Sequence, residues 1–153
     1  MNNRNSLDKY EKRLLKEIMN IMIPANQELL AAGDKGLVKE LETLFFDSIT
    51  HRKSIFKILD SIKLNIDVRM NGSFFSLEKK MKIEILKWLE KNMFDEFVIL
   101  KESIFLTYYN DNEVIKKIEW DKNFINKNEN LQIEWDKKVI SKVSKLKPFW
   151  KKI

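Results

Sequence analysis

The chain has few of the residues that crosslink a fold or interrupt its regular structure. Its 153 residues include no cysteine, 3 glycines and 2 prolines. The absence of cysteine excludes a disulfide framework and a thiolate metal site, and so few glycines and prolines are not typical of a loop-rich β-protein. With 44% hydrophobic and 34% charged residues, the composition predicts one globular domain in which helices are favoured.

A single histidine limits the chemistry that we expect of this chain. His51 carries the only imidazole in the sequence, so a metal site with two imidazoles would require a second chain. No Ser/His/Asp or Cys/His arrangement can be assembled, and the carboxylates are scattered among lysines at helical spacing, as on solvated surfaces. The sequence therefore argues against an autonomous enzyme and predicts no catalytic residue and no metal ligand. We interpret His51 as a polar residue at the start of a helix.

Long apolar runs are also absent. No stretch of 18 apolar residues could cross a membrane, and the first residues, MNNRNSLDKYEKRLLKEI, lack the apolar run of a secretory signal. As written, the chain is expected to be soluble and cytoplasmic, because no signal is visible.

Positive charge is concentrated at the C-terminal end. Residues 1–120 hold 20 Lys/Arg and 19 Asp/Glu, whereas residues 121–153 hold 9 and 4, so the tail carries +5 of the net charge of +6. A surplus that is polarised in this way indicates an anionic partner or surface.

The tail combines its lysines with aromatic residues. Residues 121–134 are interpreted as a linker, and residues 135–146 as a short amphipathic helix. Such a segment could lie on an anionic membrane, follow a phosphate backbone, dock on an acidic protein, or pack its aromatic rings on the domain with its lysines in water. The residues expected to act in this basic tail are Trp135, Lys137, Lys138, Lys142, Lys145, Lys147, Phe149 and Trp150.

Apolar residues recur at steps of three and four through most of the chain, which is the spacing of amphipathic helices. The predicted helices cover residues 6–22, 35–45, 50–70, 77–89, 94–109 and 113–120. The candidate N-caps are Asn5 or Ser6, Asp34 and Ser76, and the candidate stop signals are Pro24, Asn71 and Gly72. Residues 33–36 lack the spacing of a phosphate-binding loop and are interpreted as a turn and cap. We therefore predict an all-α fold: one compact domain of five to six helices over residues 1–120, with the basic tail over residues 121–153.

The predicted helix over residues 94–109 contains a lysine on an apolar face. At 100° per residue, Lys101 lies among Phe94, Phe97, Phe105 and Tyr108. Its stem could follow the core while the ammonium reaches water, or a buried ammonium could meet a carboxylate or helix-end carbonyls. A third interpretation is that this face contacts a partner, which the lysine reaches. The sequence leaves these three interpretations open.

Several short motifs resemble the gluconate 2-dehydrogenase subunit 3 family. An N-terminal helix runs into the sequence IMIPA at residues 21–25, FFSL follows at residues 74–77, and the helix over residues 94–109 leads through Asn110 and Asp111 to a segment ending in Trp120. Members of this family carry an IIPA element after the first helix, a leucine-serine cap before the fourth, and a long helix in which a lysine matches Lys101. The resemblance covers about residues 7–120.

The resemblance implies a bacterial, non-catalytic accessory subunit. Its partner would be a large FAD-dependent flavoprotein dehydrogenase of the glucose-methanol-choline type, which oxidises a sugar, sugar acid or alcohol, with a cytochrome as a further candidate subunit. The small subunit would bind and stabilise the flavoprotein or assist its export, and would itself hold no cofactor. Peripheral membrane association and a periplasmic location would follow if the chain is exported with its partner, although the twin-arginine signal frequent in this family is not present in the sequence.

On this interpretation the expected partner contacts are aromatic, apolar and basic residues around Lys101. The contact set is Ile23, Pro24, Phe97, Lys101, Phe105, Tyr108, Tyr109 and Trp120, with the basic tail as a second clamp. The alternative is a helical binding module for nucleic acid or an anionic membrane that acts through residues 135–153, although nucleic acid is the less favoured partner. Binding through the tail would weaken steeply with salt, whereas an interface built on apolar burial would survive moderate salt.

Overall fold

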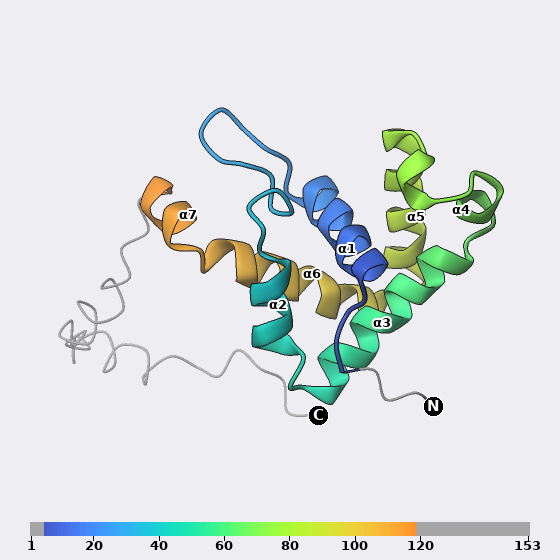
Figure 1. Cartoon of the computed structure of the whole chain (residues 1–153), viewed down its shortest axis with the longest axis horizontal. Coiled ribbons are helices and arrows are strands. Elements are labelled where there is room, and N and C mark those ends of the chain that lie inside the picture. Colours follow the sequence, from blue (N-terminus) through green and yellow to red (C-terminus); the bar gives the residue numbers. More distant parts are fainter. Residues whose placement is uncertain (1–4, 119–153) are drawn as a thin grey trace, which may run out of the picture. The chain divides into compact units, whose positions relative to one another are not determined.

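The structure, a computed structural model, describes residues 5–118, and helices supply all of the regular secondary structure of this part (Figure 1). The elements in chain order are α1 (Lys9–Met22), α2 (Val38–Phe45), α3 (Ile49–Leu64), α4 (Ile66–Met70), the 3-10 turn η1 (Phe74–Ser76), α5 (Lys79–Asn92), α6 (Phe94–Tyr109) and α7 (Asn112–Lys117). All of them belong to one compact unit. The prediction of an all-α single domain is confirmed for this part of the chain.

The helix α6 lies at the centre of the domain and runs from α5 at one end to α7 at the other (Figure 1). Its bounds are those predicted from the sequence. Leu100 and Ile104 are fully buried, and the most extensive contact between two elements is the packing of α6 on α3. Apolar residues from each of the α-helices in this part of the chain contribute to one cluster, which is the core of the unit.

A capping box, rather than Asn5 or Ser6, starts α1. The Asp8 carboxylate accepts the Glu11 amide at 2.8 Å, and the Glu11 carboxylate accepts the Asp8 amide at 3.0 Å. Glu11 is buried and its second oxygen accepts Lys63 Nζ at 2.6 Å, which joins the start of α1 to the end of α3. The helix ends at Met22, one residue before the Ile23-Pro24 pair, as predicted.

Asp34 does not cap the second helix, contrary to the prediction. Gly36 has φ +79°, a left-handed conformation that prevents a helix from starting at Asp34. The helix α2 begins later, at Val38, and has no side-chain cap. Asp34 instead pairs with Lys16 Nζ at 3.0 Å, so it fastens the turn to α1.

The predicted helix over residues 50–70 is two helices, because Asn65 interrupts it. The Asn65 side chain accepts the amides of Asp67 and Val68 at 2.9 and 3.3 Å and so caps the short helix α4. Ile66, which continues the apolar spacing, is exposed in this turn. The predicted stop is confirmed: α4 ends before Asn71, and Gly72 has φ +79°.

Ser76 is also not the cap predicted for the next helix. Its amide donates to Ser73 Oγ at 3.3 Å within η1, and α5 begins three residues later with Glu78 in the N-cap position. At the other end of the domain, Asp111 caps α7, which ends at Lys117. Trp120 and the whole basic tail lie outside the described residues.

The segment between α1 and α2 is held near its C-terminal end by two contacts. A Cβ atom at Gly33 would lie 2.1 Å from the Lys16 carbonyl oxygen, so only glycine permits this approach to α1. Further along, Lys35 Nζ pairs with Asp111 at 3.1 Å and with Glu113 at 2.5 Å. These contacts hold residues 33–36 as the turn predicted from the sequence, between α1 and the start of α7.

Candidate functional site

Three of the expected contact residues, Phe97, Lys101 and Phe105, meet at a groove between α5, α6 and the end of α1, which we name the α5–α6 groove. Its volume is about 300 Å³. The lining residues are Ile21 and Met22 of α1, Ile83, Leu86, Lys87 and Glu90 of α5, and Phe97, Lys101 and Phe105 of α6. The groove therefore has an apolar floor and three charged side chains.

Helical spacing explains how these side chains reach one groove. Phe97, Lys101 and Phe105 follow at steps of four on α6, so they share one face of that helix. Ile83, Lys87 and Glu90 are one and two turns apart on α5, and form the facing stripe. Ile21 and Met22, the first two residues of the IMIP segment, line the groove at the end of α1.

Lys101 is neither buried nor unpaired. Its Nζ donates to Glu90 Oε1 at 3.1 Å, and the two side chains are 38% and 46% exposed. The pair therefore lies at the rim of the groove, where the lysine stem borders apolar side chains and the charges remain in contact with water. This arrangement combines the first two of the three interpretations of Lys101. The stem follows apolar side chains to a surface position, and the ammonium has a carboxylate partner.

Part of the expected contact set lies in the core instead. Phe97 is 4% exposed, Tyr108 is 3% exposed, and Ile23 is also buried. In this conformation of the domain, these three side chains cannot contact a partner. Periodicity identifies an apolar face but does not say which of its residues other elements cover, and here α2, α3 and α5 pack on α6. Phe97 still contributes to the floor of the groove.

Tyr108 illustrates why its end of α6 is covered. Its hydroxyl donates to the Leu30 carbonyl at 3.3 Å, which holds the segment after α1 over the ring. Burial raises the pKa of Tyr108 above its usual value. This tyrosine is therefore a core residue with a satisfied hydroxyl, and it is not placed to act on a ligand in solvent.

Among the apolar and aromatic members of the contact set, Pro24 and Tyr109 are exposed and Phe105 is partly exposed. Phe105 is partly buried in the groove, and its ring stacks on Tyr109 with 6.2 Å between centroids. Tyr109 also meets Tyr108 edge-on at 5.3 Å, and it is 49% exposed. Beyond the groove, this part of α6 thus offers an aromatic surface to solvent.

Sequence reasoning overlooked Glu90, Ile21 and Met22 as groove residues. Glu90 could have been found from its place two turns after Ile83 on an apolar stripe. The α1 residues had no such signal, because their contact with α5 and α6 depends on tertiary packing. Trp120 and the basic tail residues remain predictions, since they lie outside the described part.

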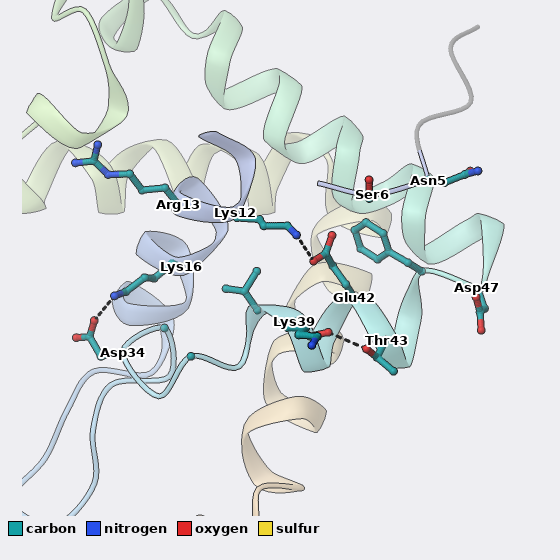
Figure 2. Close-up of a pocket in the computed structure, with 14 residues that line it drawn as sticks. Asn5, Ser6, Lys12, Arg13, Lys16, Asp34, Lys39, Glu42, Thr43 and Asp47 are labelled. Atoms are coloured by element: carbon teal, nitrogen blue, oxygen red, sulfur yellow. Dashed lines mark hydrogen bonds and ion pairs between the residues drawn. The ribbon is translucent and has the colours of Figure 1, made fainter. Parts of the chain in front are cut away.

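A second, larger hollow lies between α1 and α2, with a volume of about 750 Å³ (Figure 2). Most of its charges are already paired: Lys12 Nζ lies 3.0 Å from Glu42, and Lys16 Nζ 3.0 Å from Asp34. The hydrogen bond from Lys16 lowers the pKa of Asp34. Figure 2 shows Arg13 pointing away from Glu42, and its guanidinium covers the Phe75 ring at 4.0 Å. Because most of its charges are paired with each other, this hollow lacks the uncompensated positive charge expected of an anion-binding site.

His51 has the structural role predicted for it. Its Nδ1 lies 2.8 Å from Ser48 Oγ at the start of α3, and its ring stacks on Phe45. Within residues 5–118, no cluster of three or more histidine, aspartate or glutamate side chains could hold a metal ion.

Comparisons of this chain with protein-family models, with curated proteins and with solved structures find no match. In the described part, none of the helices has the length and apolar character needed to cross a membrane.

Proposed function

We propose that this chain is a non-catalytic accessory subunit that binds and stabilises, or assists the export of, an FAD-dependent dehydrogenase of the glucose-methanol-choline type. The α5–α6 groove is the observation that carries the proposal. The resemblance to the gluconate 2-dehydrogenase subunit 3 family supports it further, because Ile21 and Met22 and three residues of the long helix, which belong to the segments that carry the resemblance, line the groove together with α5. The flavin and the redox chemistry belong to the partner, and a cytochrome is a further candidate partner.

The groove has the composition of a surface that receives a helix or loop of another protein. Apolar side chains of Ile21, Ile83 and Phe105, which are partly exposed, provide area for burial, while the Lys101–Glu90 pair at the rim can exchange its hydrogen bonds with a partner. Lys101 acts in this proposal as an anchor that fixes orientation, since a rim charge contributes more to specificity than to affinity. A periplasmic or membrane-associated location, reached together with the flavoprotein, belongs to the same proposal.

Co-expression with a flavoprotein dehydrogenase of the glucose-methanol-choline type from the same organism tests the proposal. We expect the two to co-elute in size-exclusion chromatography, with flavin absorbance in the shared peak, at low and high salt alike. Phe105→Asp should abolish co-elution because it places a carboxylate on the groove floor. The matched control is Leu106→Asp, which changes the next residue of α6 outside the groove lining.

Lys101→Ala refines the test at the rim. We expect it to weaken the complex by up to about fivefold, as for other exposed charge pairs, and to leave the folding of the free chain unchanged. If the wild-type chain forms no complex and changes neither the solubility nor the activity of the flavoprotein, the proposal is wrong.

The second candidate, binding of an anionic membrane or nucleic acid through residues 135–153, is favoured by the tail's charge of +5. Deletion of residues 121–153 separates the two candidates. Loss of vesicle or nucleic-acid binding, with steep salt dependence before deletion, would favour the tail. Retention of the flavoprotein complex after deletion would favour the groove.

A further inference from the structure

Large apolar side chains are exposed where α3, α4 and α5 meet, on a surface that the proposed function does not use. Leu64 is 69%, Ile66 73%, Met70 80% and Trp88 55% exposed. Single exposed apolar residues are ordinary, but a group of four on adjoining elements marks a surface suited to contact. Figure 1 shows α4 lying beside α5, close to the end of α3.

This surface contains a hollow, which we name the α4–α5 hollow. Its volume is about 470 Å³, and its lining residues are Asn65, Ile66, Asp67, Met81, Glu84, Ile85 and Trp88. The hollow arises from the break at Asn65, which turns the chain into α4 and leaves a space between α4 and α5. Because its size falls in the range of ordinary ligand pockets, it has room for a few side chains of a partner.

The charges that line this hollow all have one sign. Asp67 comes from α4 and Glu84 from α5, and both are exposed. Within residues 5–118 neither carboxylate forms an ion pair, whereas Glu17, Glu90 and Glu96 each pair with a lysine of another helix. No basic side chain of the described part lines the hollow. The hollow is thus an acidic and apolar site.

We propose that the α4–α5 hollow docks a basic, apolar segment of another polypeptide. An arginine of the partner would lay its stem on Ile66 and its guanidinium against the Trp88 indole, within reach of Asp67 and Glu84. Arginine suits such a site because its planar fork binds carboxylates and stacks on aromatic rings. Flanking apolar residues of the partner would cover Leu64 and Met70. Two carboxylates repel an anionic membrane or a phosphate backbone, so a polypeptide is the occupant to which the charge is complementary.

This inference is independent of the proposed function. At 100° per residue, Glu84 and Trp88 lie on one side of α5, whereas Ile83, Lys87 and Glu90 lie on the other side, in the α5–α6 groove. A partner on either surface can bind without contact with the other.

The test is an NMR titration of the full-length, 15N-labelled chain with a blocked synthetic peptide, Leu-Arg-Leu-Leu-Arg-Leu. Matched peptides replace both arginines with citrulline, which is neutral and of the same shape, or with glutamate. We expect the arginine peptide to shift the Trp88 indole signal and the amides of Asp67 and Glu84, with a Kd of about 1 mM or lower. The citrulline peptide should bind at least about threefold more weakly, and the glutamate peptide should cause no shift at these positions.

The double variant Asp67→Asn, Glu84→Gln removes both charges and keeps the shape of the side chains. We expect it to raise the Kd of the arginine peptide at least about fivefold, while the control Asp95→Asn, Glu102→Gln, which alters exposed carboxylates of α6, leaves it unchanged. Absence of shifts at Asp67, Glu84 and Trp88 at peptide concentrations well above 1 mM, on the order of tenfold, would overturn the proposal. Equal affinity for the citrulline peptide, or for the double variant, would overturn it as well.

Discussion

The two sides of α5 carry surfaces that both combine apolar and charged side chains but differ in how their charge is arranged. In the α5–α6 groove, Lys101 is already paired with Glu90 at 3.1 Å. In the α4–α5 hollow, Asp67 and Glu84 have no ion pair within the described part of the chain. Where charge is compensated internally, association rests on apolar burial and tolerates salt; where it is not, a partner must supply the opposite charge, and binding falls as salt rises.

The largest effect is expected from Leu89→Ala, which removes the support of both surfaces. Leu89 is buried on α5 and belongs to the core cluster. Its truncation leaves a cavity, and we expect the free energy of unfolding in urea to fall by about 2–5 kcal/mol. Binding at both surfaces should weaken together. Trp88→Ala is the control, because this neighbouring side chain is exposed; an equal loss for both variants would contradict the assignment of Leu89 to the core.

Two glycines allow one surface to be disturbed without the other. Gly33→Ala places a Cβ 2.1 Å from the Lys16 carbonyl of α1, and α1 supplies Ile21 and Met22 to the α5–α6 groove. We expect a loss of about 1–3 kcal/mol in the free energy of unfolding. The largest NMR shifts should lie in the hollow between α1 and α2, which Lys16 and Gly33 line, with smaller shifts along α1 at Ile21 and Met22 and none at the α4–α5 hollow.

Gly72→Ala is the counterpart near the hollow. Gly72 follows α4 at φ +79° and faces open space, so alanine meets only backbone strain there, of about 1–2 kcal/mol. The accompanying NMR shifts should appear at α4 and Trp88. Shifts of equal size at both surfaces in either glycine variant would show that the two surfaces are coupled.

A smaller effect is expected from the ion pair that ties α5 to α1. Lys82 Nζ lies 2.7 Å from Glu17 Oε1, and the lysine side chain is mostly buried. Lys82→Met keeps the apolar stem but leaves Glu17, which is partly exposed, to water, so we expect a loss of about 1 kcal/mol in thermal or urea unfolding. Lys80→Met, on the exposed side of the same helix, should have little effect. A stability loss of the same size there would show that charge alone, not the pair, is responsible.

The smallest effect concerns acid stability at the end of α6 farthest from α5. Burial alone would raise the pKa of Asp111, but hydrogen bonds from the Val114 amide and from Lys35 lower it overall. A carboxyl with a lowered folded pKa stabilises the fold above its unfolded value, about 3.9, and this contribution is lost as the pH falls through the folded pKa.

Asp111→Asn should therefore reduce stability at neutral pH and make it depend less on pH below about pH 4. Thermal unfolding across this range measures the difference. Unchanged acid sensitivity would mean that other carboxyls dominate the titration. Binding at both surfaces of α5 should remain as in the wild type, which provides a baseline for the other variants.

Local signals predicted much of the fold because they act within a few residues. The bounds of α6 and the end of α1 at Ile23-Pro24 followed from apolar spacing and proline geometry. The start of α1 did not follow from such local signals, because Asn5, Ser6 and Asp8 are all acceptable caps. The buried Glu11–Lys63 pair, which joins two helices far apart in the sequence, selects Asp8. Capping by a side chain is a local interaction, but tertiary contacts decide which of several possible caps forms.

The candidate site was predictable in part for the same reason. The apolar face around Lys101 was visible in the sequence, and so was the stripe of α5. Which residues of that face are buried depends on where α1 ends and on the segment held by Tyr108, so the sequence did not show that Phe97 is buried at the groove floor or that Tyr108 belongs to the core. The hollow at Asn65 had no signal, because Ile66 continues the apolar spacing across the break.

The central position of α6 also has a consequence for synthesis of the chain. Translation proceeds from the N-terminus, so α1 to α5 emerge from the ribosome before Leu100 and Ile104, the residues that fill the centre of the core. Until α6 has emerged, the apolar face of α3 lacks its main neighbour and stays exposed to water or to a chaperone. Completion of this domain is therefore tied to the release of one late helix, and a pause in translation before residue 94 would lengthen the time for which that face is exposed.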